Sequence, residues 1–313
     1  MFMKLLRNCF CFLLMLPVIA QAQVDSSQLM KDLQTLSANK FEGRKTGTRG
    51  NRMAQFYIIN RFKEIGIAAY HDTYEYPFYF QEREKNVMGT NLFGYIHGQL
   101  STAIVISAHY DHLGIQTGAN GADSIYNGAD DNASGVAGLL AMAAWFKKHP
   151  PRYTLIFVAF DGEEEGLQGA KAFVQQPPIP ITQIRQNINM DMIAHNDKNE
   201  LYVCGTYQFP DLKKYIDDIA AHSNIKLIAG HDKPESGIDD WTRQSDQYEF
   251  FRQKIPFLYF GVEDHPDYHK VTDEYSRINH SFYFHSVQTI LELIRKLDSE
   301  MPENKFSSVR TMN

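Results

Sequence analysis

The apolar run Ala-Ile-Val-Ile-Ser-Ala at residues 103–108 leads directly into the polar stretch His-Tyr-Asp-His at residues 109–112. An unbroken apolar run of this length is typical of a strand that is buried on both faces. A second run, Thr-Leu-Ile-Phe-Val-Ala-Phe at residues 154–160, leads into Asp-Gly-Glu-Glu-Glu at residues 161–165. The two runs predict neighbouring buried strands that carry acids and histidines at their carboxyl ends.

Helices and strands alternate on either side of these two runs. Helical spacing of apolar residues predicts helices at 25–38, 134–147, 166–175, 211–222 and 282–297, and another that ends at Gly66. Shorter β-prone runs lie at 74–80, 91–96, 188–190, 201–204 and 256–261. This alternation predicts an α/β fold with a mostly parallel central sheet and helices on both faces. Because the sequence shows no repeat, low-complexity tract or long linker, we expect one domain over residues 23–313.

Composition excludes several classes of protein. The chain has 313 residues, of which 43% are hydrophobic and 22% charged, so disorder, collagen and coiled coil are excluded. The formal net charge is −6, which gives no basic surplus for nucleic acid or anionic lipid. We therefore expect no nucleic-acid partner.

The first 22 residues resemble a signal peptide. Lys4 and Arg7 precede an apolar run at residues 9–20, and Ala20-Gln21-Ala22 fits a small-residue cleavage site. The run is short for a membrane span, although an uncut N-terminal anchor is the alternative. We expect export to the periplasm or the medium, and a mature chain without a membrane span. Cleavage would leave Cys204 as the single cysteine, so no internal disulfide would form.

Acids and histidines gather in five loops at the predicted edge of the sheet; four follow predicted strands, and the loop 127–135 precedes a helix. These loops lie at residues 109–112, 127–135, 161–166, 189–191 and 265–269. One such cluster would be explained by helix capping or by a solvated acidic turn. Five together favour a catalytic site for zinc or a similar ion, because the candidate ligands are His, Asp and Glu without thiolates. Two ions would need roughly five ligands with one bridging carboxylate, and the loops supply that number.

These motifs, in this order, resemble the co-catalytic zinc exopeptidases of metallopeptidase family 28. That family includes bacterial leucyl aminopeptidases, glutamate carboxypeptidase and the related glutaminyl cyclases. The matching stretches are 107–114, 127–135, 157–170, 189–191 and 266–273, and the resemblance covers about residues 41–297. It implies the zinc-exopeptidase (phosphorylase/hydrolase-like) fold.

The resemblance also implies a ligand set for two Zn²⁺ ions. His109, Asp130 and Asp191 would hold one ion. Asp130, Glu164 and His269 would hold the other, with Asp130 as the bridge and a cis peptide between Asp130 and Asp131.

Catalytic roles follow from the same resemblance. Asp111 would accept the second N–H of the His109 imidazole and fix its tautomer. Glu163 would be the general base that takes a proton from the attacking water and returns it to the leaving amine. Local chemistry alone does not decide which of Glu163, Glu164 and Glu165 is the general base. The register of the family motif implies that Glu165 is the extra acid, with a solvated side chain.

One position departs from the family pattern. The family often has Ser-Asp-His where this chain has Ser245-Asp246-Gln247, in a segment that lines the substrate pocket of relatives. Tyr248 has two possible roles: its phenol could contact the reaction intermediate, or it could be a tyrosine of the core or of the pocket rim. The aromatic residues of 248–251, together with Tyr268, indicate an apolar wall for the first side chain of the substrate. For the remaining histidines near the motifs we expect surface or supporting roles; these are His112, His195, His231 and His265.

The expected function is an exported aminopeptidase that releases N-terminal residues from peptides. A glutaminyl cyclase on the same fold, a carboxypeptidase or dipeptidase, and a zinc-bound protein without catalysis remain as alternatives. The presence of all five ligand positions and of Glu163 favours the peptidase.

Overall fold

The computed structural model describes residues 23–116 and 123–303. The predicted signal peptide at residues 1–22 lies outside these described residues. Within them, no helix combines the length and the apolar character needed to cross a bilayer.

The centre of the molecule is a nine-stranded sheet with the order β1-β3-β7-β4-β8-β11-β9-β10, to which β2 is added by pairing with β3. Its strands are β1 (Ala68–Ala69), β2 (Glu75–Glu82), β3 (Lys85–Ile96), β4 (Leu100–His109), β7 (Tyr153–Phe160), β8 (Ile184–Met190), β9 (Glu200–Cys204), β10 (Lys226–Ala229) and β11 (Phe257–Gly261). The short strands β5 (Gly114–Ile115) and β6 (Ile125–Tyr126) form a separate two-stranded sheet.

Four central strands, β7, β4, β8 and β11, run parallel, and antiparallel pairs flank them through β3 on one side and β9 on the other. The predicted fold class is therefore confirmed, with the parallel strands concentrated at the centre. The strands β1 and β10 and the short pair β5 and β6 are not predicted by the sequence, because four residues or fewer carry little periodicity.

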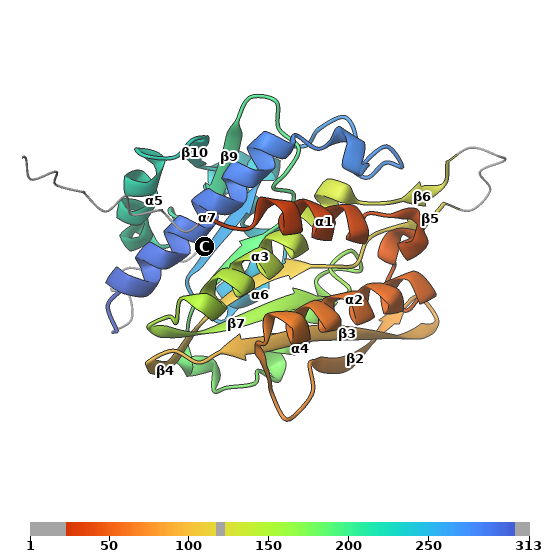
Figure 1. Cartoon of the computed structure of the whole chain (residues 1–313), viewed down its shortest axis with the longest axis horizontal. Helices are drawn as coiled ribbons and strands as arrows, with labels where there is room; N and C mark the ends of the chain where they lie inside the picture. The colour runs from red at the N-terminus through yellow and green to blue at the C-terminus, as the bar shows by residue number, and fades with distance from the viewer. Residues whose placement is uncertain (1–22, 117–122, 304–313) are drawn as a thin grey trace, which may run out of the picture.

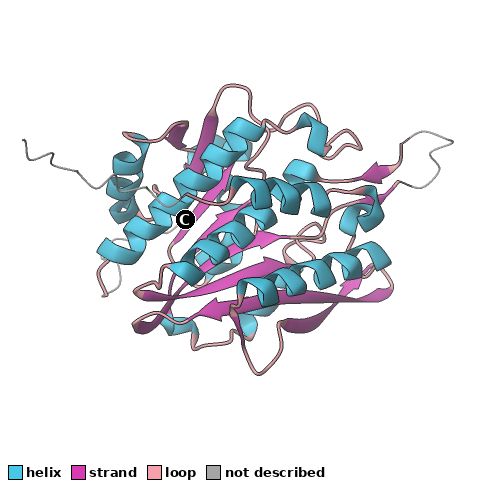
Figure 2. Ribbon diagram, in the orientation of Figure 1, coloured by secondary structure: helices cyan, strands magenta, loops and turns pink. Residues whose placement is uncertain are grey.

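Helices cover both faces of this sheet (Figures 1 and 2). They are α1 (Ser26–Leu36), α2 (Arg49–Ile65), α3 (Gly135–Lys148), α4 (Gln168–Gln175), α5 (Lys213–Ala220), α6 (Gln247–Arg252) and α7 (His280–Glu300). Alternate strand residues belong to two separate cores: Ile104 and Ile106 pack with α1, α2, α3 and α7, whereas Val105 packs with Phe173 of α4 and Phe250 of α6. This alternation explains why the central strands are apolar at nearly every position.

The helix ends follow the sequence signals. The Asp25 carboxylate accepts the backbone N–H of Gln28 at 3.0 Å and caps α1. Helix α2 ends at Gly66, whose φ of 79° is the left-handed conformation that glycine adopts without strain.

Arg44 ties together the segments that will surround the site. Its buried guanidinium donates hydrogen bonds to the carbonyls of Tyr110 (2.8 Å), Leu36 (2.8 Å), Asn127 (2.6 Å) and Gly128 (2.9 Å). Burial lowers the pKa of Arg44 to about 10, so it stays charged at neutral pH. A single side chain therefore joins the loop after β4 to the turn before α3.

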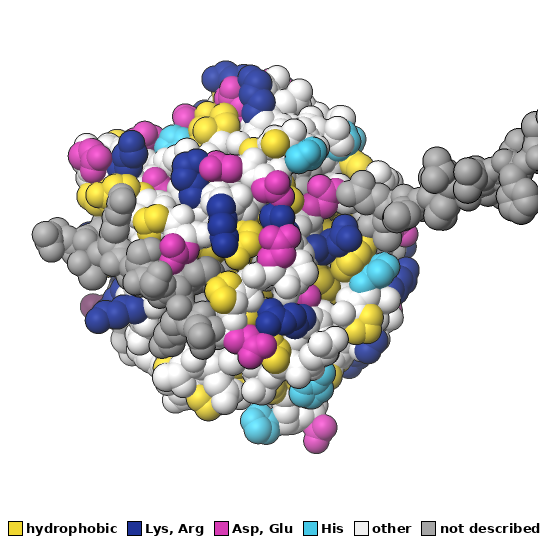
Figure 3. Space-filling view, turned by 90° about the vertical axis from the view of Figure 1, so that its left-hand side faces the viewer, with side chains coloured by type: hydrophobic (Ala, Val, Ile, Leu, Met, Phe, Trp, Pro, Cys, Tyr) yellow, Lys and Arg dark blue, Asp and Glu magenta, His cyan; other side chains and the backbone are white. Residues whose placement is uncertain are grey.

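On the face over α5 and α7, the described residues carry charges of both signs. Lysine and arginine side chains alternate with aspartate and glutamate across it (Figure 3). The Lys296 ammonium, for example, lies 2.7 Å from Asp218 and 2.8 Å from Glu300.

Candidate metal centre

The carboxyl edge of the parallel strands gathers the side chains that the sequence singled out. His109 is the last residue of β4, Glu163 follows β7, Asp191 follows β8 and His269 lies beyond β11. Asp131 joins them from η2 (Ala129–Ser134), a single wide turn that leads into α3. Parallel strands place their carboxyl ends at one edge, which explains why residues this far apart in the chain meet.

Asp131 lies between two imidazoles. Its Oδ1 is 3.3 Å from Nε2 of His109, and its Oδ2 is 3.1 Å from Nε2 of His269. Asp191 adds an oxygen 3.1 Å from His109, and Glu164 adds one 3.5 Å from His269. One carboxylate thus serves two adjacent clusters of ligand atoms.

The expectation that Asp130 is the bridge is wrong by one residue. The Asp130 carboxylate turns away and accepts the N–H of Ala194 at 2.7 Å, and its Oδ2 lies 3.1 Å from Nε2 of His265. The cis peptide is likewise one residue further along, between Asp131 and Asn132. Two identical neighbours allow either register in the sequence, and only the backbone of the turn decides which carboxylate faces the histidines.

Asp273 holds this turn from the other side. Its carboxylate accepts the backbone N–H of Asp130 at 3.0 Å and that of Asp131 at 3.0 Å. Burial, followed by the charge of Asp130, raises the pKa of Asp273 to about 7. Sequence analysis did not single out this residue, because only the folded turn brings its carboxylate to these amides.

His112 belongs to the centre, so the surface role is wrong and the supporting role is the one that the geometry fits. It is fully buried, and its Nδ1 lies 2.7 Å from Oε1 of Glu164 and 3.6 Å from Oδ2 of Asp131. His112, Asp131 and Glu164 place their ligand atoms within 4.8 Å of one another, as do His109, Asp131 and Asp191. The sequence did offer a signal for His112, because it is the second histidine of the His-Tyr-Asp-His stretch whose first histidine, His109, was already a predicted ligand.

Asp111 supports the centre in a different way from the one predicted. The Nδ1 of His109 lies 3.2 Å from the backbone carbonyl oxygen of Asp111, and 3.7 Å from its carboxylate. The carboxylate instead accepts the backbone N–H groups of Glu163 (3.1 Å) and Glu164 (3.3 Å). Asp111 therefore orients His109 through its carbonyl and fixes the acidic loop through its side chain.

The three adjacent glutamates have three different surroundings. Burial raises the pKa of Glu163 well above its ordinary value; the imidazole of His109 opposes this rise, and Asp191 adds to it. Although burial opposes ionisation, hydrogen bonds from His112 and His269 lower the pKa of Glu164 to about 2.

Glu165 is not solvated, contrary to expectation. Its side chain is only 10% exposed, and it accepts a hydrogen bond from the Lys45 ammonium at 2.9 Å. The glutamates at 163 and 164 thus belong to the centre, while Glu165 belongs to a neighbouring ion pair.

The electrostatics of the centre favour a cation. Burial would lower the pKa of His269, yet Asp131 and Glu164 raise it to about 10. The same opposition, with Asp191 and Glu163 as the acids, raises the pKa of His109 well above its ordinary value. Imidazole nitrogens and carboxylate oxygens without thiolates are donors that suit catalytic zinc, so the residues present fit that ion.

A cavity of about 80 Å³ opens onto the centre. The acidic side is formed by Asp131, Glu163, Glu164 and Asp191, and the other walls by His269, Met192, Trp241, Gln244, Tyr259, Val262, Asp264 and Tyr268. The apolar wall is therefore present, and Tyr268 contributes to it as predicted. The aromatic segment 248–251 does not line this cavity, because Phe250 packs in the core against Phe173 of α4.

Gln247 acts behind this wall. It is fully buried, its Oε1 accepts the side-chain N–H of Asn189 at 3.0 Å, and its Nε2 donates to the carbonyl of Trp241 at 2.9 Å. The Tyr248 ring lies near the guanidinium groups of Arg243 (5.8 Å) and Arg252 (6.0 Å), and Tyr248 is not among the residues that line the cavity. Gln247 therefore helps to hold the backbone of Trp241, which lines the cavity.

Comparisons with known proteins give a sequence family and a fold. The sequence model of Peptidase family M28 matches residues 91–294. The alkaline phosphatase isozyme conversion protein of Escherichia coli is 30% identical over 173 residues, which are 51% of this chain and 50% of that protein. This chain thus spans about half the length of that curated relative.

Two solved structures share the fold. The LapA aminopeptidase of Legionella pneumophila has a TM-score of 0.69 at 18% identity, covering 89% of this chain and 73% of LapA. The glutaminyl cyclase of Bacteroides thetaiotaomicron, solved with N-acetylhistamine, has a TM-score of 0.69 at 17% identity, covering 88% of this chain and 98% of that enzyme. At such identities the likeness establishes the fold alone.

Proposed function

Since the chain belongs to peptidase family M28, we propose that it is a zinc-dependent metallopeptidase, and specifically an aminopeptidase that releases N-terminal residues from peptides. The observation that carries this proposal is the position of Asp131. Its two oxygens lie 3.3 and 3.1 Å from the imidazoles of His109 and His269. A carboxylate shared between two ligand clusters is what a two-metal hydrolase requires.

The residues divide into two ligand sets. His109, Asp131 and Asp191 would hold one Zn²⁺, and Asp131, Glu164 and His269 the other, with His112 close to the second set. When bound, the two ions would lower the pKa of water and polarise the scissile carbonyl group.

Glu163 would move the proton. It lines the cavity but makes neither of the short contacts by which Glu164 joins the ligand set. Its pKa, raised by burial, suits a group that takes a proton from water and then donates it to the leaving amine. Asp111 would keep Glu163 in position through the backbone hydrogen bond at 3.1 Å.

The cavity suits a free α-amine next to an apolar side chain. Asp191 and Asp264 supply negative charge around it, and an α-ammonium group would be attracted to them. Met192, Trp241, Tyr259, Val262 and Tyr268 supply apolar surface. We expect leucyl, methionyl and phenylalanyl substrates to be preferred over glutamyl and aspartyl ones.

A glutaminyl cyclase is the second candidate, because the fold matches the Bacteroides cyclase with the same TM-score as it matches LapA. The test is a panel of aminoacyl-nitroanilides, their N-acetylated counterparts and an N-terminal glutaminyl peptide, each assayed with zinc and after chelation. The proposal predicts chelator-sensitive hydrolysis of the free-amine substrates and a loss of orders of magnitude on acetylation. Equal hydrolysis of acetylated substrates would refute the aminopeptidase, and cyclisation without hydrolysis would establish the cyclase. Zinc binding without turnover of any substrate would leave a binding protein.

We also propose that the chain is exported to the periplasm or the medium. The support is the sequence of residues 1–22, with Lys4 and Arg7 before an apolar run and a small-residue cleavage site. N-terminal sequencing of the protein recovered outside the cytoplasm should begin at Gln23. Recovery of the intact chain in the cytoplasm would contradict this proposal.

A further inference from the structure

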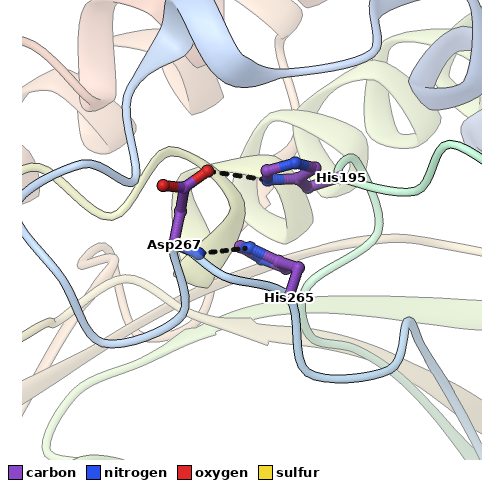
Figure 4. Close-up of side chains that lie close together, drawn as sticks. All are labelled: His195, His265 and Asp267. Carbon is purple, nitrogen blue, oxygen red and sulfur yellow. Dashed lines mark hydrogen bonds and ion pairs between the residues drawn. The ribbon is translucent and has the colours of Figure 1, made fainter.

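A third cluster of metal-ligating side chains lies outside the centre at Asp131. His195 comes from the loop after β8, and His265 and Asp267 come from the loop after β11 (Figure 4). One ligand atom from each lies within 4.8 Å of the others. The two imidazole rings are 4.0 Å apart between centroids.

His265 is held in a single tautomer. Its Nε2 lies 3.1 Å from Oδ2 of Asp130, and its Nδ1 accepts the backbone N–H of Asp267 at 3.3 Å. Nε2 must therefore carry the proton, which leaves the lone pair on Nδ1. A carboxylate that orients a histidine from behind is the usual support of a metal-bound imidazole. The displaced Asp130, which takes no part in the first centre, supplies that support here.

The other two members each leave an atom available. The Nδ1 of His195 is buried without a hydrogen-bond partner, and it lies 3.9 Å from Oδ2 of Asp267. The Oδ1 of Asp267 already accepts a hydrogen bond from the Thr272 hydroxyl at 2.6 Å, so Oδ2 is the oxygen that remains. Zinc bonds to nitrogen and oxygen are about 2.0–2.2 Å long, and two ligands of one ion can therefore lie up to roughly 4 Å apart.

We propose that His195, His265 and Asp267 bind a further divalent cation of the zinc class. Two imidazole nitrogens and one carboxylate oxygen form a ligand set that Zn²⁺ accepts, with water in the remaining position. The charges balance, because the Asp267 and Asp130 carboxylates together match a doubly charged ion. The ion replaces the 3.3 Å hydrogen bond to Nδ1 of His265, which is long for an N–H donor.

Such an ion would have a structural effect on the first centre. Asp267 is two residues before His269, and His195 is four residues after Asp191. Binding would join the two loops that carry these ligands, and would fix the loop of His269, whose side chain is 38% exposed. Asp130, adjacent to Asp131, connects the two sites through the chain.

The test counts metal ions by difference. Purified protein is stripped with chelator, dialysed against excess Zn²⁺ alone, and analysed for zinc per chain, with His195→Ala as the variant and the exposed His222→Ala as the matched control. The proposal predicts that His195→Ala holds one zinc fewer than the wild type and that His222→Ala holds the same number. Equal zinc content in all three proteins, or the same loss in both variants, would overturn it.

A second measurement uses the wild-type protein, so its result does not depend on whether the variant folds. Anomalous scattering from wild-type crystals at the zinc edge should show a peak between His195, His265 and Asp267. Absence of that peak at saturating zinc would overturn the proposal. Neither measurement depends on the ions at Asp131, because the difference concerns His195 and the peak has its own position.

Discussion

Replacement of Asp131 and of Asp130 by asparagine separates the two possible registers of the turn. Both substitutions remove one buried negative charge and leave the size of the side chain unchanged. Asp131 faces His109 at 3.3 Å and His269 at 3.1 Å, so Asp131→Asn removes an anionic ligand from both ions. Removal of one partner from a buried charge pair costs about 3–5 kcal/mol, which corresponds to roughly a 10²- to 10⁴-fold weaker affinity for zinc.

Asp130→Asn should behave differently. In the wild type, the Asp130 carboxylate accepts the N–H of Ala194 at 2.7 Å, and the amide oxygen of asparagine can still accept it. The contact that is weakened is the one with Nε2 of His265. We expect a stability loss of about 1–3 kcal/mol and little change in the affinity of the catalytic ions.

The assay is the free zinc concentration that gives half-maximal hydrolysis of a leucyl nitroanilide after chelation. It should rise roughly 10²- to 10⁴-fold for Asp131→Asn and remain within about tenfold for Asp130→Asn. The opposite ranking of the two variants would show that Asp130 is the bridge and would refute the geometry described here.

Three further outcomes are expected. Glu163→Gln should retain zinc but lose about 10²- to 10⁴-fold in kcat, whereas the kcat of Glu165→Gln should stay within a few-fold of the wild-type value. If only Glu165→Gln is inactive, the general base is Glu165 and not Glu163. Without metal, the pKa of His269 is raised to about 10, and zinc needs the neutral imidazole, so zinc binding at pH 8 should release protons and should weaken as the pH falls. Calorimetry in buffers of different ionisation enthalpy measures the number of protons released, and a value of zero would contradict the prediction. Arg44→Met should lower the free energy of unfolding by about 3–5 kcal/mol, because four buried carbonyls lose their hydrogen-bond donor. The control Arg49→Ala, at an exposed ion pair, should cost less than about 1 kcal/mol. Equal losses in denaturant titrations of the two variants would exclude this role for Arg44.

The fold could be predicted because its signals are local and repeated. The runs at 103–108 and 154–160 are apolar at consecutive positions, and helices on both faces are the packing that such strands need. Gly66 marked a helix end by itself. The loops at the carboxyl edge then located the centre without any knowledge of side-chain direction.

The errors concern the direction in which a side chain points. Asp130 and Asp131 are identical neighbours, and the backbone of η2 sends their carboxylates to different partners. Glu165 was judged solvated because its partner Lys45 is 120 residues away in sequence. Such distant pairings are set by the folded backbone and leave no periodic signal in the chain.

Gln247 shows the same limit for specificity. A family difference at one position suggested a changed substrate wall, but the side chain is buried and bonded to the carbonyl of Trp241 at 2.9 Å. The wall itself comes from residues such as Met192 and Tyr259, which no motif marked. Tertiary structure thus decides which aromatic residues meet a substrate.

The most direct test of a two-metal centre is anomalous scattering at the zinc edge from crystals of the zinc-loaded protein. Two peaks are predicted at the carboxyl edge of the sheet, one between His109, Asp131 and Asp191 and the other between Asp131, Glu164 and His269. The Asp131 carboxylate should contact both. A single peak at this edge under saturating zinc, or a pair of peaks bridged by another residue, would contradict the account.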